Sequence, residues 1–387
     1  MTASDSTRIY FAGGGTGGHL YPGLAIARAV VRLAPQVVPH FIGARRGIER
    51  EILPGTEFTH TLLDLHPLYR RTPWNNWRTL VGAVSAWRAI SALSRNAPPR
   101  AVVGTGGYAA GVALAWARAH GIPTMLHEPD SHPGLTTRAF AGGARAIYLG
   151  FPEARQRLSP GARTEVLPLG CPIEPPPVIR PTRAEARARW ALPEDAFVVL
   201  VMGGSQGARA INEMIAAWID LGLPERVCLV WSTGRQQAAA WVDRESARVR
   251  VRPYLSPIAE AYAAADVAVA RAGAMSIAEL CAWGIPALLV PLPTAAQDHQ
   301  TYNARATAQS GGALCIPQRE LSVARLDSEV RALMTDPARF ELMRTAMLAR
   351  ARPDAAQAIA RSVLEILGIP MRGVPPLDTA VSPYLQV

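Results

Sequence analysis

Short apolar runs alternate with segments of helical periodicity along the first half of the chain. Runs typical of buried strands lie at 8–13, 37–43, 100–107 and 123–128, and helical patterns lie at 22–34 and 111–121. This alternation is typical of right-handed βαβ units, in which helices pack against a parallel sheet. The pattern therefore predicts an α/β domain with a doubly wound parallel sheet.

A proline-rich segment interrupts this pattern, which then starts again. The segment CPIEPPPVIRPT at 171–182 contains five prolines, and it cannot continue a helix or a central strand. After it, FVVLVMGGSQGARAINEMIAAW at 197–218 repeats the strand, glycine turn and helix found at 8–30. We therefore expect two Rossmann-like domains whose strands direct their carboxyl ends toward a shared cleft.

The length of the chain agrees with this division, because 387 residues are more than one hydrophobic core usually includes. The expected parts are a first domain at 1–170, a linker at 171–182, a second domain at 183–350, a C-terminal helix at 351–368 and an irregular tail at 369–387.

Composition and charge narrow the range of partners without selecting one. The chain is 49% hydrophobic and carries a net charge of +10, which favours phosphates, nucleotides, nucleic acids or an anionic membrane surface. The four cysteines form no CxxC pair, so neither a disulfide framework nor a cysteine zinc site is indicated.

The stretch at 101–117 lacks charged residues but contains four glycines, and we interpret it as strand, loop and helix, not as a membrane span.

The first glycine-rich loop follows the first predicted strand directly. Gly13, Gly15 and Gly18 satisfy G-x-G-x-x-G, so a dinucleotide site is one hypothesis. That fold usually has an acidic residue about 20 residues further on, whereas the second strand ends in FIGARRG, with Arg45 and Arg46. These arginines leave NADP as an alternative ligand.

His19 follows this loop at once, and Pro22 is typical of the first turn of a helix. A histidine above a loop that approaches a ligand is a candidate base. The alternative is a capping or solvent-exposed histidine.

Three further features have the residue types of a nucleotide-sugar site. GGSQGARA at 203–210 places a glycine turn and the Ser205 hydroxyl before a helix, which suits a phosphate. Glu279 lies inside a predicted helix that begins near Ala274; it could accept both hydroxyls of a ribose, or be an ordinary surface residue. The run at 298–300, DHQ, could bind sugar hydroxyls or cap a helix.

Six motifs together resemble the MurG family of peptidoglycan glycosyltransferases. They are GGGTGGHLYPGLAIA, GTGGYAAGV, HEPDSHPGLTTR, GGSQGARAIN, RAGAMSIAEL and QDHQTYNA, in order between about residues 8 and 365. The resemblance implies a GT-B fold, with the sugar nucleotide held mainly by the second domain and a lipid-linked acceptor by the first.

The resemblance also implies the reaction and its partners. The family moves N-acetylglucosamine from UDP-N-acetylglucosamine to the C4 hydroxyl of the muramoyl sugar of lipid I, with inversion, and forms lipid II. We therefore expect a peripheral enzyme at the cytoplasmic face of the bacterial plasma membrane, without a transmembrane span, a cofactor or a nucleic-acid partner.

Site residues are carried over position by position from the resemblance. His19 is the expected base, and Glu128 is the alternative; Gly14, Gly15 and Tyr108 are expected at the acceptor. The positions expected at the donor are Thr16, Gly17, Gly18, Asp130, Ser205, Leu255, Ala274, Met275, Ser276, Ile277, Ala278, Glu279 and Gln300.

Two motifs depart from the family pattern. The family's HEQN is HEPD here, so Asp130 replaces an asparagine that contacts the sugar; a carboxylate accepts hydrogen bonds from hydroxyls but cannot donate. The family's GNPVR is GCPIE, so Glu174 stands in place of an arginine and receives no donor role.

The chain contains no D-x-D pair of the kind that holds a metal in many sugar-nucleotide transferases. We expect no metal, and we expect helix N-termini and backbone N–H groups to stabilise the departing diphosphate.

The segment 67–95 combines aromatic and basic residues as a membrane-surface helix does. Trp74, Trp77, Val81, Val84 and Trp87 lie at near-helical spacing, with Arg70, Arg71, Arg78 and Arg88 nearby. The alternative is that these aromatic residues belong to the core.

Three other functions stay open at this point. A different GT-B transferase would share both loops and differ in its acceptor. An NADP oxidoreductase would use only the first loop. A non-catalytic nucleotide-sugar-binding protein would result if the HEPD and GCPIE departures disabled the site.

Overall fold

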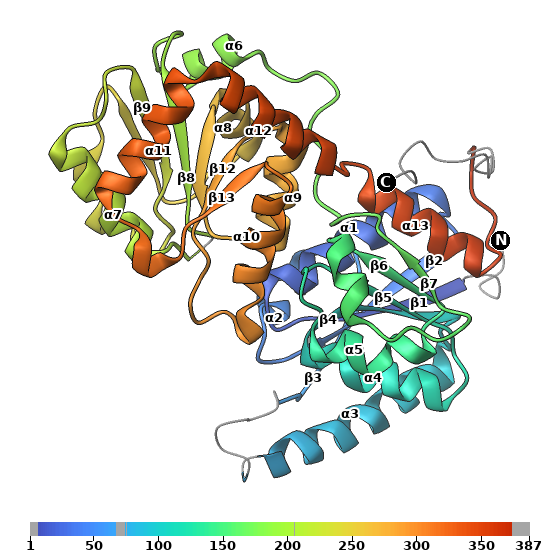
Figure 1. Cartoon of the computed structure of the whole chain (residues 1–387). Coiled ribbons are helices and arrows are strands. Elements are labelled where there is room, and N and C mark those ends of the chain that lie inside the picture. The colour runs from blue at the N-terminus through green and yellow to red at the C-terminus, as the bar shows by residue number, and fades with distance from the viewer. Residues whose placement is uncertain (1–6, 67–73, 75, 205, 374–387) are drawn as a thin grey trace.

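The computed structural model describes residues 7–66, 74, 76–204 and 206–373, whose strands form two parallel sheets in two domains (Figure 1). The N-terminal domain has a seven-stranded sheet in the order β3-β2-β1-β4-β5-β6-β7. Its strands are β1 (Thr7–Gly13), β2 (Val37–Ala44), β3 (Thr59–Leu63), β4 (Ala101–Gly106), β5 (Thr124–Glu128), β6 (Ala146–Leu149) and β7 (Glu165–Leu167).

Strand β1 is buried on both faces, as its apolar run predicts. Ile9 and Phe11 pack in a cluster with α1 (Gly17–Leu33), and Tyr10 and Ala12 pack in a second cluster with α3 (Asn76–Asn96) and α4 (Gly107–Ala119). Alternate residues of a strand face opposite sides of the sheet, so one short run anchors both helical layers. The uncharged stretch 101–117 forms β4 and most of α4, as expected.

The C-terminal domain repeats this arrangement with a six-stranded sheet in the order β10-β9-β8-β11-β12-β13. Its strands are β8 (Phe197–Met202), β9 (Val227–Ser232), β10 (Val249–Arg252), β11 (Val267–Ala270), β12 (Ala287–Leu289) and β13 (Ala313–Cys315). Its helices are α6 (Arg183–Arg189), α7 (Arg209–Leu221), α8 (Ile258–Ala264), α9 (Ala274–Trp283), α10 (His299–Gln309), α11 (Val323–Thr335) and α12 (Pro337–Arg350).

Strand order reverses at the first strand of each sheet. β1 pairs with β2 on one side and β4 on the other, and β8 pairs with β9 and β11. In open parallel sheets, ligands bind beyond the carboxyl ends of the strands at such a reversal. The two glycine loops follow β1 and β8, so both lie at these positions.

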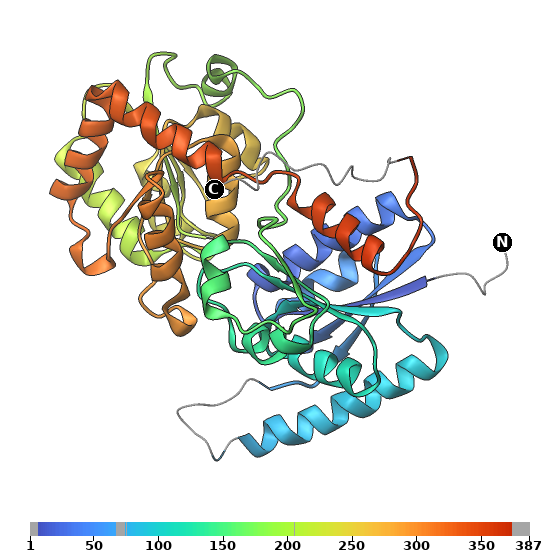
Figure 2. The same cartoon turned by 45° about the vertical axis from the view of Figure 1, so that its right-hand side comes forward.

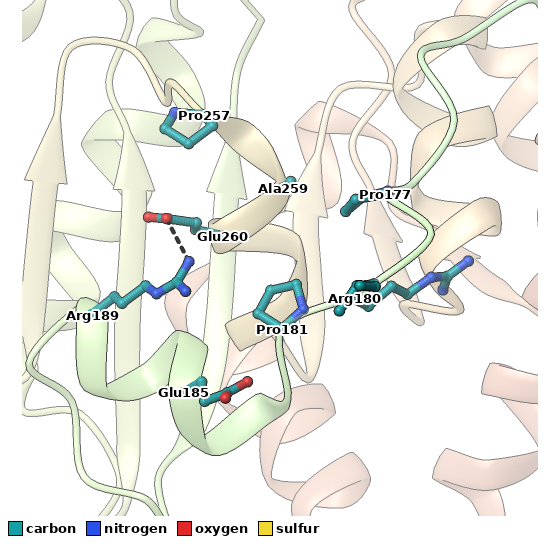
Figure 3. A pocket seen from close by; sticks show the side chains of 9 residues that line it. Pro177, Arg180, Pro181, Glu185, Arg189, Pro257, Ala259 and Glu260 are labelled. Atoms are coloured by element: carbon teal, nitrogen blue, oxygen red, sulfur yellow. Dashed lines mark hydrogen bonds and ion pairs between the residues drawn. The ribbon is translucent and has the colours of Figure 1, made fainter.

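The proline-rich segment 171–182 leads from the first sheet to α6, which begins with a capping box between Thr182 and Glu185. A cavity of about 380 Å³ lies between this segment and α8 (Figure 3). Arg189 and Glu260 line it and form an ion pair at 2.8 Å. None of the described residues expected at the functional site lines this cavity.

The chain returns to the N-terminal domain at its end. Helix α13 (Ala355–Ile366) lies against α1 and buries Ile359 and Val363 in the core beneath it (Figure 2). The Tyr148 hydroxyl donates to Ser362 Oγ at 3.1 Å. The C-terminal helix is therefore part of the N-terminal core, and the chain connects the two domains twice.

Within the described residues no helix is both long enough and apolar enough to span a membrane.

Replacement of Ile359 by Ala should lower the free energy of unfolding of the N-terminal domain by about 2–5 kcal/mol, because the side chain is fully buried. Urea denaturation measures this change. Gln357→Ala, at an exposed position of the same helix, is the matched control and should change it by less than about 0.5 kcal/mol. Equal effects of the two variants would contradict the packing of α13 on α1.

Candidate active site

His19 lies in the first turn of α1, half-buried, and Thr105 at the end of β4 holds it in two ways. The ring Nδ1 is 3.1 Å from the Thr105 carbonyl oxygen, and the Thr105 hydroxyl donates to the His19 carbonyl at 2.7 Å. A carbonyl oxygen can only accept, so Nδ1 bears the hydrogen. The neutral ring therefore has its free lone pair on Nε2.

Two glycines, the last residue of β4 and the first of α4, make room for this ring. A Cβ on Gly106 would lie 2.6 Å from His19 Nδ1, and one on Gly107 would lie 3.3 Å from its Cδ2. Both residues have positive φ, +100° and +77°, a region in which side chains cause strain. The GTGGY motif is thus shaped around the histidine.

Burial lowers the pKa of His19, and several charges modify this effect. The Asp130 carboxylate and the Thr105 carbonyl raise the pKa, His299 lowers it, and Glu49 raises it. His19 is therefore neutral at pH 7, as a general base must be.

Glu128, at the buried end of β5, is held by the loop that follows it. Its Oε1 accepts from the Asp130 N–H at 3.1 Å, and its Oε2 accepts from the Gly134 N–H at 2.9 Å. Burial raises its pKa to about 7, helped by the Asp130 charge and opposed by these hydrogen bonds and one from Thr137. Both oxygens are occupied, so Glu128 shapes the loop at 129–134.

Asn303, on α10 of the C-terminal domain, joins the two domains through a fully buried amide. Its Oδ1 accepts from the Ser131 N–H at 2.8 Å and from the Ser131 hydroxyl at 2.9 Å. Its Nδ2 donates to Asp130 Oδ1 at 2.7 Å and to the Ala272 carbonyl at 3.2 Å. This side chain thus uses all its hydrogen-bonding capacity. Three of its four bonds cross the boundary between the domains.

Asp130 contacts a second residue of α10. Its Oδ2 is 3.6 Å from His299 Nδ1, and the charges of both residues act on His19. The carboxylate that departs from the family pattern is therefore bound to the opposite domain, and its contact with the sugar stays a prediction.

Aromatic and charged side chains extend this contact between the domains. The rings of His132 and Tyr302 stack at 4.6 Å, and the Arg157 guanidinium lies 4.7 Å from the Tyr302 ring centre. Arg138 donates to Gln297 Oε1 at 2.8 Å.

Gln297 and Asp298 both have positive φ, 54° and 56°, and such strain concentrates at functional sites.

The donor half of the predicted site surrounds the N-terminus of α9. No side chain caps this end, which follows Gly273, so its free N–H groups suit an anion. The expected positions Ala274, Met275, Ser276, Ile277 and Ala278 form the first turns of this helix.

Glu279 and Gln300 lie near this helix end with defined partners. Tyr262 donates its hydroxyl to Glu279 Oε2 at 2.7 Å, and burial raises the pKa of Glu279. Gln300 Oε1 accepts from the N–H groups of Ala272 and Leu292, at 3.2 and 3.0 Å. Its amide NH2 therefore points away from these bonds and suits a sugar hydroxyl.

The structure describes one of two other expected donor positions, Leu255 and Ser205. The Leu255 side chain is buried in the core of the C-terminal domain, so only its backbone could contact a base. Ser205 lies outside the described residues. Gly207, in the same loop, has a φ of +82°, and a Cβ there would lie 2.1 Å from the Thr233 carbonyl.

The first glycine loop uses its earliest amides internally. The Gly15 N–H donates to Glu49 Oε1 at 3.0 Å, and the Gly14 N–H lies 3.4 Å from the Gly106 carbonyl. Thr16 makes no side-chain cap for α1, which leaves the helix start, including Gly17 and Gly18, suited to an anion.

Tyr108 lies beside this loop. A Cβ on Gly15 would lie 3.1 Å from its ring.

Sequence reasoning missed three residues of this region: Thr105, Glu49 and Asn303. Asn303 lies one helical turn after Gln300, and this i, i+3 spacing was the available signal. Nothing local distinguishes Glu49 within the charged run ARRGIERE.

Within the described residues, no group of three or more His, Cys, Asp or Glu side chains could hold a metal ion.

Comparison with known proteins identifies the class. The N-terminal domain of glycosyltransferase family 28 matches residues 9–149, and the C-terminal domain of the same family matches residues 198–359. The predicted GT-B fold is confirmed by a solved MurG from Acinetobacter baumannii, with a TM-score of 0.72 and 26% identity. That match covers 93% of this chain and 99% of the other.

Two relatives have the same name, UDP-N-acetylglucosamine--N-acetylmuramyl-(pentapeptide) pyrophosphoryl-undecaprenol N-acetylglucosamine transferase. The protein from Moorella thermoacetica is 38% identical, over 92% of this chain and 98% of its own length. The one from Salinibacter ruber is 38% identical, over 92% of this chain and 96% of its own length. The chain therefore belongs to glycosyltransferase family 28 and, within it, to the MurG family, which confirms the resemblance found in the sequence.

Asn303→Ala should loosen the contact between the domains, because it leaves several buried polar groups unpaired, at about 1–3 kcal/mol each. Small-angle X-ray scattering should record a larger radius of gyration. Asn212→Ala is the matched control: Asn212 is equally buried, but it bonds Thr233 and Trp231 within one domain. The control should lower stability and leave the radius unchanged. An unchanged radius in Asn303→Ala would contradict the role of this amide.

Proposed function

We propose that this protein transfers N-acetylglucosamine from UDP-N-acetylglucosamine to the C4 hydroxyl of the muramoyl sugar of lipid I and forms lipid II. The observation that supports this most strongly is the full-length similarity to transferases named for that reaction. The geometry supports it as well, because the Asp130 charge acts on His19 of the N-terminal domain and the same carboxylate accepts from Asn303 of the C-terminal domain.

We propose a single displacement with His19 as the base. The acceptor oxygen attacks the anomeric carbon while the bond from that carbon to the β-phosphate oxygen of UDP breaks. The hydroxyl proton passes to His19 Nε2, the nitrogen left free by the bond from Nδ1 to the Thr105 carbonyl. Attack opposite to the leaving group inverts the anomeric configuration.

The departing diphosphate needs charge stabilisation that the chain can supply itself. The uncapped N-terminus of α9 offers backbone N–H groups, and preorganised donors of this kind act strongly in a site that excludes water. In this proposal the positions from Ala274 to Ala278 and Ser205 hold the diphosphate. Glu279 holds the ribose, Gln300 the sugar, and the backbone at Leu255 the uracil.

The first glycine loop would bind the acceptor and close over the donor. Because the Gly14 and Gly15 amides bond within the protein, we assign the anion contacts to the N–H groups at Thr16, Gly17 and Gly18. Gly14, Gly15 and Tyr108 would shape the acceptor pocket. The carboxylate of Asp130 would accept from a sugar hydroxyl.

We also propose that the protein binds the cytoplasmic face of the plasma membrane through α3. Trp74, Trp77, Leu80, Val81 and Val84 are 45–72% exposed, and α3 lies at the outer edge of the N-terminal domain in both views (Figures 1 and 2). Such an apolar patch on a helix suits a membrane surface.

One detail of the sequence expectation differs for this helix. Trp87 packs partly against the core, so it contributes less to the patch than its spacing suggested. Arg70 and Arg71 lie outside the described residues, and so does the side chain of Arg78. Arg88 is exposed on the same helix.

His19→Ala should lower turnover with a short-chain lipid I analogue by about 10²–10⁴ and leave UDP-N-acetylglucosamine binding nearly unchanged. His60→Ala is the matched control, because His60 is also half-buried with Nδ1 near a backbone carbonyl, that of Phe58 at 3.4 Å. The control should keep full activity. Absence of any transfer to the analogue by the unmodified protein would contradict the proposed reaction.

The pH dependence of kcat/KM separates the two candidate bases. His19 must be neutral to act, and its pKa is lowered below 6.5, so activity should rise with pH through a midpoint below 6.5 and then stay level. Glu128 as the base would place that midpoint at about 7. A midpoint at about 7 that disappears in Glu128→Gln would overturn the assignment of His19.

Val81→Glu should weaken co-sedimentation with vesicles of anionic phospholipid and leave stability within about 0.5 kcal/mol, because it places a charge in the exposed patch. Leu342→Glu is the control: Leu342 is 73% exposed on α12 of the other domain. Equal vesicle binding by both variants would show that α3 is not the docking element.

A further inference from the structure

Glu49 is a buried carboxylate directly behind the first glycine loop. It begins the short helix α2 (Glu49–Ile52) after β2 and is fully buried. Its Oε1 accepts from the Gly15 N–H at 3.0 Å and from the Ala44 N–H at 3.1 Å. One oxygen thus ties the loop after β1 to the end of β2.

Three glycines from three segments enclose this side chain. A Cβ on Gly14 would lie 1.6 Å from Glu49 Oε1, and one on Gly47 would lie 1.9 Å from Oε2. A Cβ on Gly43 would lie 3.0 Å from the Glu49 Cβ. Any larger residue at Gly14 or Gly47 would displace the carboxylate, so the position of Glu49 requires glycine at both.

The hydrogen bonds alone do not require a carboxylate side chain at this position. Oε2 is buried and has no hydrogen-bond partner within the described residues, and a buried charge is costly unless it is compensated. A glutamine would offer the same accepting oxygen. The nearby arginines bond elsewhere, Arg45 to the Leu62 carbonyl at 3.1 Å and Arg46 to Asp64 at 3.4 Å.

His19 is a group on which this charge acts. Burial lowers the pKa of His19; Asp130 and the Thr105 carbonyl raise it, His299 lowers it, and Glu49 adds a smaller effect that raises it. The charge of His19 in turn acts on His127, whose pKa is lowered by burial and further by His19. When His19 takes the acceptor proton it becomes a cation, and a nearby carboxylate stabilises that form.

We propose that Glu49 is a positioning residue of the transfer reaction. It fixes the loop with the Gly15 N–H turned inward and the following amides free for an anion, and its charge stabilises the His19 imidazolium. This rests on the proposed role of His19 as the base.

Glu49→Gln tests the charge with little change of shape, and Glu51→Gln, at an exposed position of the same helix, is the matched control. In the free protein, an NMR titration of the His19 ring should move to lower pH by about half a unit or more in Glu49→Gln and stay unchanged in the control. This readout needs no substrate, so it decides the electrostatic part even if the proposed reaction fails.

Turnover tests the positioning part. Glu49→Gln should lower kcat about tenfold or more. This loss is smaller than the loss of about 10²–10⁴ expected when the base itself is removed. Gly47→Ala keeps the charge but displaces the carboxylate, so it should lower kcat as well, and it serves as the second variant if Glu49→Gln does not fold. Wild-type kcat in a folded variant of either kind, or an unmoved His19 titration in Glu49→Gln, would overturn the proposal.

Discussion

The arrangement of the site depends on one buried amide, that of Asn303. It is fully buried and forms hydrogen bonds with Ser131 and Asp130 of the other domain and with Ala272 of its own. Buried polar networks are strong when every member is satisfied and costly when one is not. These polar contacts, with the stacked rings of His132 and Tyr302, hold the two domains against each other beside the candidate site.

Much of the fold followed from the sequence because its signals are local. Apolar runs such as 8–13 form central strands, and the glycine turns follow β1 and β8 as expected. The contacts that complete the site are not local. The return of α13 to α1, the bond from Asn303 to Ser131 and the cage around Glu49 join segments up to hundreds of residues apart. No short pattern encodes such pairs, and the charged run around Glu49 looks like an ordinary solvated surface.

The glycines illustrate the difference between a motif and its physical cause. In the sequence, a cluster such as GGGTGG suggests that the backbone approaches a phosphate. In the structure, Gly14 and Gly47 accommodate the Glu49 carboxylate, while Gly106 and Gly107 accommodate the His19 ring. Much of this glycine content therefore serves the placement of two side chains, and in our proposal the anion contacts fall to the N–H groups at Thr16, Gly17 and Gly18.

A crystal structure with an unreactive UDP-N-acetylglucosamine analogue and a soluble lipid I analogue would show whether His19 and the N-terminus of α9 meet the two substrates. We expect the diphosphate of the donor at the N-terminus of α9 and the C4 hydroxyl of the acceptor within about 3 Å of His19 Nε2. An acceptor hydroxyl that lies against Glu128 instead, or a donor bound away from α9, would contradict this expectation.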